Sequence, residues 1–110
     1  MLVTMALALH LVEEVRTGFR LRFPLGEMPA PLFVGINMGI YAFALVMLAL
    51  SMAHHPAHVP MAWVFSIAVA LNGAAHLGIM AVRRSYFPGG FTAPILVVTS
   101  ATAISRLLTL

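Results

Sequence analysis

The residues best suited to chemistry in this chain stand close together in the stretch His10-Leu11-Val12-Glu13-Glu14. On an α-helix, residues three and four positions apart lie on the same side, so both carboxylates can converge with the imidazole on one small volume. Imidazole and carboxylate groups are ligands for divalent transition metals, and a carboxylate can also act as a general acid or base. This stretch is therefore a candidate site, and the rest of the chain must position it.

The composition predicts an integral membrane protein around these ionisable groups. Hydrophobic residues make up 62% of the 110-residue chain and charged residues only 8%, and the mean hydropathy is +1.03. Soluble domains carry roughly 25% charged residues. Ionisable residues within membrane spans are costly, which makes them functional candidates. The chain contains no cysteine, which excludes disulfides, thiolate metal sites and a cysteine nucleophile.

Four apolar segments divide the sequence, at about 1–19, 30–53, 60–83 and 91–110. Segments of this length match the roughly 17–25 residues that a helix needs to cross a bilayer. We therefore expect an all-α membrane protein, a single domain folded as an antiparallel four-helix transmembrane bundle. Five of the six arginines lie in residues 16–29 and 83–90, which contain the first and third connections and the charged ends of the segments before them. The positive-inside rule places those connections in the cytoplasm and both termini outside, and the positive charge then indicates topology rather than a nucleic-acid partner.

The polar residues of the four segments share one predicted depth. With a rise of about 1.5 Å per residue, His10 and His76 both lie on the order of 10 Å from the arginine that next follows them. Asn72 precedes His76 by one helical turn and faces the same side. The other two segments add polar residues at a similar depth: Asn37, Tyr41, Thr99 and Ser100. This agreement predicts one buried polar site in the cytoplasmic half of the bundle.

These residues also carry a resemblance to a known family. His-x-x-Glu-Glu closes the first apolar segment, and Asn72-Gly-Ala-Ala-His76 and Tyr86-Phe-Pro-Gly-Gly-Phe-Thr-Ala93 follow. Together they resemble the HXXEE-motif family of small bacterial integral membrane proteins, over most of the chain. The resemblance implies a polytopic fold in the bacterial cytoplasmic membrane. Because the family takes its name from a motif, it implies no particular reaction.

The predicted site fits a transition metal. His10, His76 and Glu14 would give two imidazoles and one carboxylate with open positions, a set that suits catalytic zinc or non-haem Fe(II). Glu13 and Glu14 point about 100° apart on a helix, which favours one as a ligand and the other as a general base, although Glu13 remains a candidate ligand. One divalent ion is the first choice, because a dinuclear site would need a further anion or a second subunit.

Other predicted members of the site have simpler roles open to them. Asn72, Asn37 and Tyr41 could orient the ligands or merely bond neighbouring helices. Glu13 could pair with Arg16, one helical turn further on. The three histidines of the second connection are most simply part of a solvated turn: His54, His55 and His58.

The favoured function is a metal-dependent enzyme that oxidises, hydrates or hydrolyses a lipophilic small molecule entering from the bilayer or the cytoplasm. One alternative is a metal-free isomerase or cyclase, in which a carboxylic acid with a raised pKa moves a proton. Another is a metal or proton conduit or a ligand sensor. Membrane lipids are expected neighbours. A homo-oligomer is possible because four short helices enclose little volume.

Overall fold

A computed structural model describes residues 1–110, and it is entirely helical. It contains four α-helices and one short 3-10 helix, with no strand, which confirms the predicted helical class. Their bounds are α1 Leu2–Thr17, η1 Phe19–Arg22, α2 Ala30–Met52, α3 His58–Arg83 and α4 Ala93–Leu108.

Local chemistry explains where the helices begin and end. Gly18 takes the left-handed conformation with φ 75°, and its N–H bonds to the Glu14 carbonyl, so α1 stops at Thr17 instead of continuing to residue 19. Helix α3 begins at His58, two residues before Pro60. A proline in the first turn is tolerated because the N–H that it lacks would have no partner within the helix.

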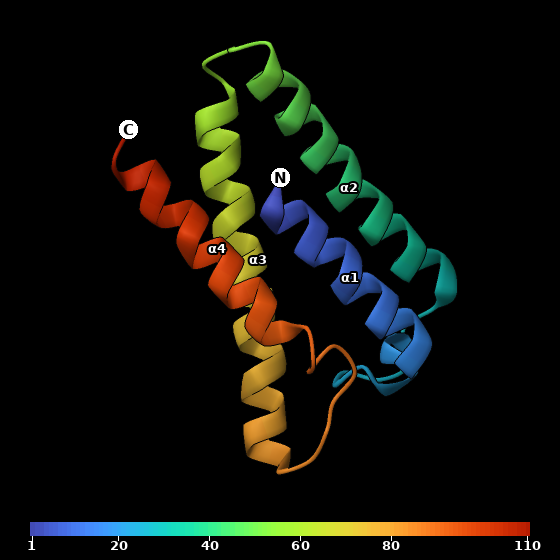
Figure 1. Cartoon of the computed structure of the whole chain (residues 1–110). Coiled ribbons are helices and arrows are strands. Elements are labelled where there is room, and N and C mark those ends of the chain that lie inside the picture. Colours follow the sequence, from blue (N-terminus) through green and yellow to red (C-terminus); the bar gives the residue numbers. More distant parts are fainter.

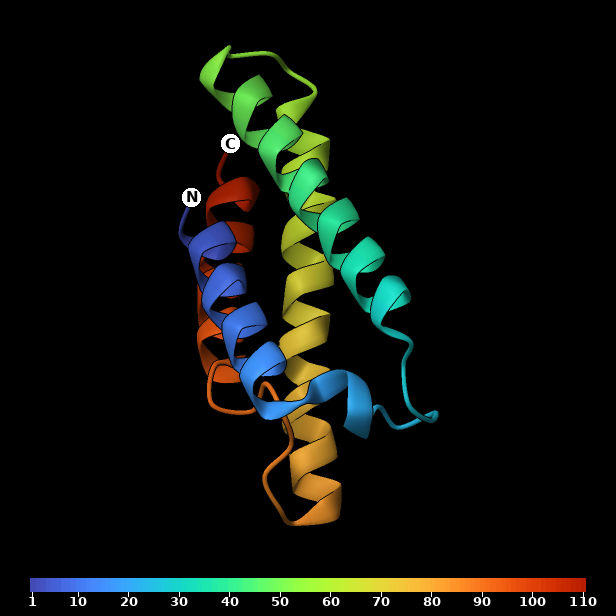
Figure 2. The same cartoon turned by 90° about the vertical axis from the view of Figure 1, so that its right-hand side faces the viewer.

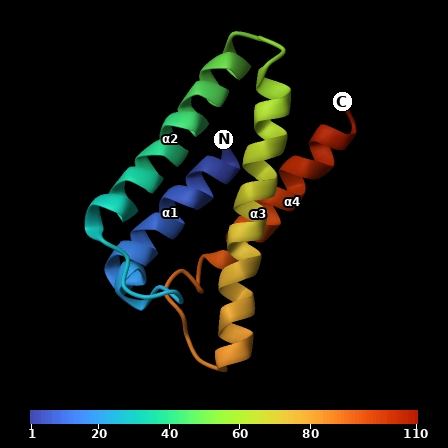
Figure 3. The same ribbon diagram turned by 180° about the vertical axis from the view of Figure 1, so that it is seen from behind.

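Successive helices run in opposite directions along the molecule (Figure 1). Helices α3 and α4 form the most extensive pair, and α1 packs mainly against α4. The opposite view shows α1 beside α2 (Figure 3), yet the backbones of these two helices come close to each other at very few points. Seen from the side, α2 diverges from the other helices towards the end that holds η1 (Figure 2). The spread of α2 leaves space beside the site described below.

A small apolar core joins the helices at mid-height. Its buried members come from all four helices: Val3, Ala6, Leu7, Ala44, Phe65, Val69 and Leu96. Gly73 explains the close approach of α3 and α4, because a Cβ there would lie 2.9 Å from the Ala93 carbonyl oxygen. This contact holds the start of α4, and the loop before it, against the middle of α3.

Two helices, α2 and α3, are long and apolar enough to cross a membrane, with mean hydropathies of 2.1 and 1.7 in their best windows. Helices α1 and α4 have 16 residues each. At about 1.5 Å per residue they are roughly 24 Å long, shorter than the ~30 Å hydrocarbon core.

Candidate metal site

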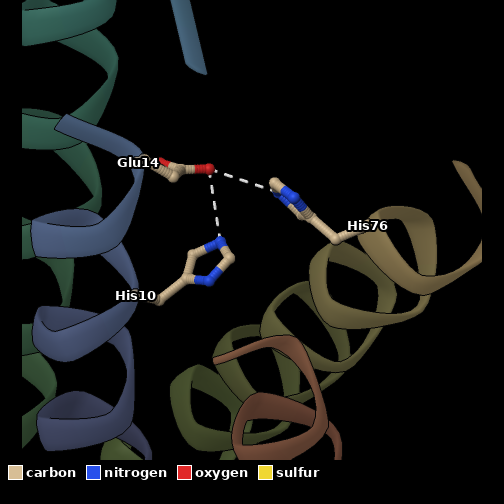
Figure 4. Close-up of side chains that lie close together, drawn as sticks. All are labelled: His10, Glu14 and His76. Carbon is tan, nitrogen blue, oxygen red and sulfur yellow. Dashed lines mark ion pairs between the residues drawn. The ribbon is translucent and has the colours of Figure 1, made fainter. Parts of the chain in front are cut away.

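Two histidines and one glutamate meet in the interior, between α1 and α3. His10 Nε2 and His76 Nε2 each lie 3.2 Å from the same oxygen, Oε1 of Glu14. Figure 4 shows both rings turned towards this carboxylate. The three atoms lie within 4.8 Å of one another. A tetrahedral centre with bonds of about 2.0 Å would separate its ligand atoms by roughly 3.3 Å. The two nitrogen–oxygen distances of 3.2 Å match this value, whereas the 4.8 Å spread of the three atoms shows that the two nitrogens lie further apart.

The helices place these side chains by simple periodicity. His10 and Glu14 are four residues apart on α1 and therefore share a face. His76 comes from α3, and its ring meets that of His10 edge to face with centroids 4.6 Å apart. All three residues are buried, with exposures of 1% for His10, 7% for Glu14 and 2% for His76. No arginine pairs with Glu14, so its carboxylate has only the two imidazoles as ionic partners.

The other nitrogen of each ring is held by a hydrogen bond, which fixes the tautomer. His76 Nδ1 lies 2.8 Å from the Pro88 carbonyl oxygen, which can only accept, so Nδ1 carries the proton. His10 Nδ1 lies 2.7 Å from Thr92 Oγ1. The Thr92 hydroxyl donates to a carboxylate oxygen of Glu13 at 2.6 Å, so it must accept from His10. In their neutral forms, His10 and His76 would both aim an Nε2 lone pair at Glu14.

Three acceptor atoms that face one another at such distances need a cation or protons between them. Metal-bound histidines usually donate their second ring N–H to a carboxylate, a backbone carbonyl or a water molecule, and these partners are often hydrogen-bonded in turn. His76 donates to the backbone carbonyl of Pro88, and His10 donates to the Thr92 hydroxyl, which is hydrogen-bonded in turn to Glu13. The surroundings of the site thus match those of a metal centre.

Glu13 points away from this centre and binds the loop between α3 and α4. Its carboxylate accepts hydrogen bonds from Tyr86 Oη at 2.6 Å, Phe91 N at 2.9 Å and Thr92 N at 2.8 Å, besides the Thr92 hydroxyl. Glu13 is therefore not among the grouped metal-ligand atoms, and it makes no ion pair with Arg16. Burial, and then the hydrogen bond to Glu13, raise the pKa of the Tyr86 hydroxyl.

Gly89 lets the same loop approach both histidines. A Cβ at this position would lie 2.6 Å from His76 Nδ1 and 2.7 Å from His10 Cε1. Gly89 also has φ 90°, a region that side chains other than glycine rarely adopt. Beside it, Phe87 is 2% exposed and packs on the His76 ring with centroids 5.5 Å apart. The loop forms one wall of the site.

The structure places the remaining predicted residues at different distances from the centre. Asn72 is close, with Nδ2 3.4 Å from His10 Nε2. Asn37 donates to the Phe33 carbonyl of its own helix. Tyr41 packs against the apolar core, and its buried hydroxyl has no hydrogen-bond partner. From α4, the residue at the site is Thr92, which caps the N-terminal end of the helix. The predicted Thr99 instead donates to the Ile95 carbonyl, and the buried Ser100 hydroxyl has no hydrogen-bond partner.

A cavity of about 620 Å³ borders the site between α1, α2 and α3. Thirteen of its 18 lining residues are hydrophobic. The polar exceptions include His10, Glu14, Asn37 and Asn72. A lipophilic molecule in this space would therefore meet the His/Glu centre directly.

Comparison with known proteins identifies the family. The model of a family described as "Protein of unknown function with HXXEE motif" matches residues 1–104, nearly the whole chain. The chain belongs to the HXXEE family. No curated protein and no solved structure matches it.

Within this HXXEE chain, the motif residues have separate tasks. The histidine and the second glutamate face the buried centre, whereas the first glutamate holds the loop that supports both histidines. Sequence reasoning did not assign Tyr86, Pro88, Gly89 or Thr92 to the site, although all four lie in the Tyr-Phe-Pro-Gly-Gly-Phe-Thr block that carried the family resemblance. That block was the available signal for them.

Proposed function

We propose that this protein is a membrane-embedded metalloenzyme that acts on a lipophilic small molecule. The observation that carries the proposal is the convergence of two Nε2 lone pairs on one carboxylate oxygen, while both Nδ1 atoms are held as donors. A divalent metal supplies the positive charge that this arrangement needs. The apolar cavity beside the centre supplies the space for a substrate.

Membrane insertion is supported by the surface as well as by the hydropathy of α2 and α3. Only 20 of 110 residues are buried, and large apolar side chains are exposed on the spanning helices: Met38, Leu45, Val64 and Leu71. A soluble protein of this size rarely exposes so much apolar surface. We propose four crossings with both termini outside a bacterial cytoplasmic membrane. The arginine-rich connections then face the cytoplasm and the metal centre lies in the cytoplasmic half.

The donor set favours one zinc or Fe(II) ion held by His10, Glu14 and His76. Two imidazoles and one carboxylate leave coordination positions open, and such a centre, when loaded, can activate water or dioxygen. A single ion is preferred because Glu13, the fourth predicted ligand, is occupied by four donors from the loop. For the same reason Glu13 positions the site and does not act as its base. Oxidation, hydration and hydrolysis are the reactions open to this centre.

A metal-free acid–base enzyme is the second candidate, because a proton on Glu14 could also bridge to a histidine. Metal analysis separates the two. The protein is purified anaerobically in detergent, reconstituted with Fe(II) or Zn(II), and passed through a desalting column before elemental analysis. We expect about one metal ion per protein chain in the wild type and almost none in His10→Ala or His76→Ala.

His55→Ala serves as the matched control, because His55 lies in the exposed turn between α2 and α3 and should leave the metal content unchanged. Absence of metal from the reconstituted wild type would overturn the metalloenzyme proposal and favour the acid–base enzyme. Equal metal content in all four proteins would show that the ion binds elsewhere.

A further inference from the structure

The cavity beside the metal centre is open on one side, and this opening determines what can enter it. It is bounded by α1, α2 and α3, and the backbones of α1 and α2 come close to each other at very few points. The end near η1 is closed by aromatic rings, since Phe19 lies against Phe23 and Phe33 with centroids 5.7 and 6.2 Å apart. Along α3 the lining continues from Asn72 back to Val64, a distance of about 12 Å at the helical rise. The cavity is therefore a groove with a polar floor and an apolar extension.

The charges around the groove are unsuited to an anionic head group. Glu14 is the only acidic residue in the lining, and no arginine takes part in it. In the metal-free protein, a phosphate or carboxylate buried there would lack the cationic partner that normally offsets its desolvation. The groove therefore favours an uncharged molecule.

Two amides offer complementary hydrogen-bonding groups inside the groove. Asn37 Nδ2 donates to the Phe33 carbonyl oxygen at 2.9 Å, so the other atom of its amide, Oδ1, is an acceptor. Asn72 presents Nδ2, a donor whose contact with His10 Nε2 is a long 3.4 Å. A ligand group that both donates and accepts can bond to either amide, because it can donate to Asn37 Oδ1 or accept from Asn72 Nδ2. A hydroxyl does this, whereas a carboxylate or an ester can only accept.

We propose that the groove binds an uncharged lipophilic alcohol, with its hydroxyl at Asn37 and Asn72 and its hydrocarbon chain along Ala68 and Phe43. That this alcohol is the substrate rests on the proposed metalloenzyme function. Its binding does not, because neither amide is a proposed metal ligand. Of the three proposed ligands, His10 and Glu14 line the groove and His76 does not. The hydroxyl end would lie beside the metal centre, and the chain would enter sideways between α1 and α2.

Fluorescence quenching tests this placement. Phe43 lines the groove, whereas Trp63, the only tryptophan, does not. Phe43→Trp in a Trp63→Phe background places a single tryptophan in the groove. The wild-type protein, whose only tryptophan lies outside the groove, serves as the control for quenching by ligand dissolved in the detergent. The probe is dodecanol brominated at the carbon furthest from the hydroxyl. We expect saturable quenching of the introduced reporter and only weak, non-saturating quenching of Trp63.

Variants of the groove test the chemistry of the ligand. Ala68→Leu should fill the groove and weaken binding by at least about tenfold, whereas Ala74→Leu, an exposed position outside it, should not. Asn37→Leu and Asn72→Leu should each lower the affinity for the alcohol by about fivefold, which corresponds to the usual net contribution of one hydrogen bond. In the metal-free protein, dodecanoate and a lysophosphatidylcholine should not compete with the alcohol.

Two results would overturn the proposal: equal binding of the alcohol and the carboxylate, or equal effects of Ala68→Leu and Ala74→Leu. The His76→Ala variant separates this inference from the metalloenzyme function. Saturable quenching that survives in His76→Ala supports the groove independently of the metal. Quenching lost in His76→Ala, with its helical content intact, would contradict a groove whose amides bind the alcohol alone.

Discussion

Replacing Gly89 by alanine should disable the metal centre without unfolding the helices. The added Cβ would lie 2.6 Å from both Cε1 and Nδ1 of His76 and 2.7 Å from Cε1 of His10. Overpacking of this kind costs about 1–3 kcal/mol. The φ of 90° at this position adds a backbone strain of about 1–3 kcal/mol for a residue with a side chain. The smaller values together give about 2 kcal/mol, which corresponds to roughly a 30-fold loss of affinity.

The assay is a competitive titration of Co(II) or Zn(II) against a chromophoric chelator, with circular dichroism to verify the helical content. Two other glycines separate the contributions. Gly26 has φ 112° with nothing within 4 Å of a Cβ, so Gly26→Ala carries backbone strain without a clash. Gly78 has free space around it and an ordinary φ, so Gly78→Ala carries neither. Metal affinity should fall only in Gly89→Ala, and wild-type affinity in that variant would refute the role given to the loop.

Two further predictions concern the contacts that hold this loop. Thr92→Val removes the hydroxyl that accepts a hydrogen bond from His10 Nδ1, so metal affinity in the same titration should fall by about 10–100-fold. Thr92→Ser keeps the hydroxyl and should retain most of the affinity. Equal losses in both variants would contradict a role for the hydroxyl. The raised pKa of Tyr86 means that its hydrogen bond to Glu13 stabilises the fold below pH 10 and is lost as the pH rises through the higher folded-state pKa. The 295 nm absorbance titration of the wild type minus that of Tyr86→Phe should therefore have its midpoint above pH 10. A midpoint at or below pH 10 would contradict the hydrogen bond between Tyr86 and Glu13.

Helical periodicity was enough to predict that His10 and Glu14 share a face, because four residues make about one turn. Counting residues from the nearest arginine also placed His76 at the level of His10, and the structure brings the two rings together. These inferences worked because both helices run in the same direction and pack without a large shift. The same count could not separate Glu13 from Glu14 in function, since it gives their angular difference but not which neighbour each one faces.

The rest of the site depends on a loop whose path periodicity does not describe. Pro88 and Thr92 reach the histidines only because Gly89 takes a positive φ and lies directly against both rings. The position of α2 was equally hard to foresee. Because they lie at a similar depth, Asn37 and Tyr41 were predicted to belong to the same site. In the structure α2 diverges from α1, so Asn37 lines the groove and Tyr41 packs on the apolar core.

The hydrogen bonds of Glu13 have a consequence for the order in which the chain assembles. All its partners lie between residues 86 and 92, so they are synthesised more than 70 residues after Glu13 itself. Until then the carboxylate has no partner from this loop, and burying it would be unfavourable. Helix α1 is made first but should reach its final position last, after α3 has formed and the start of α4 has docked on it.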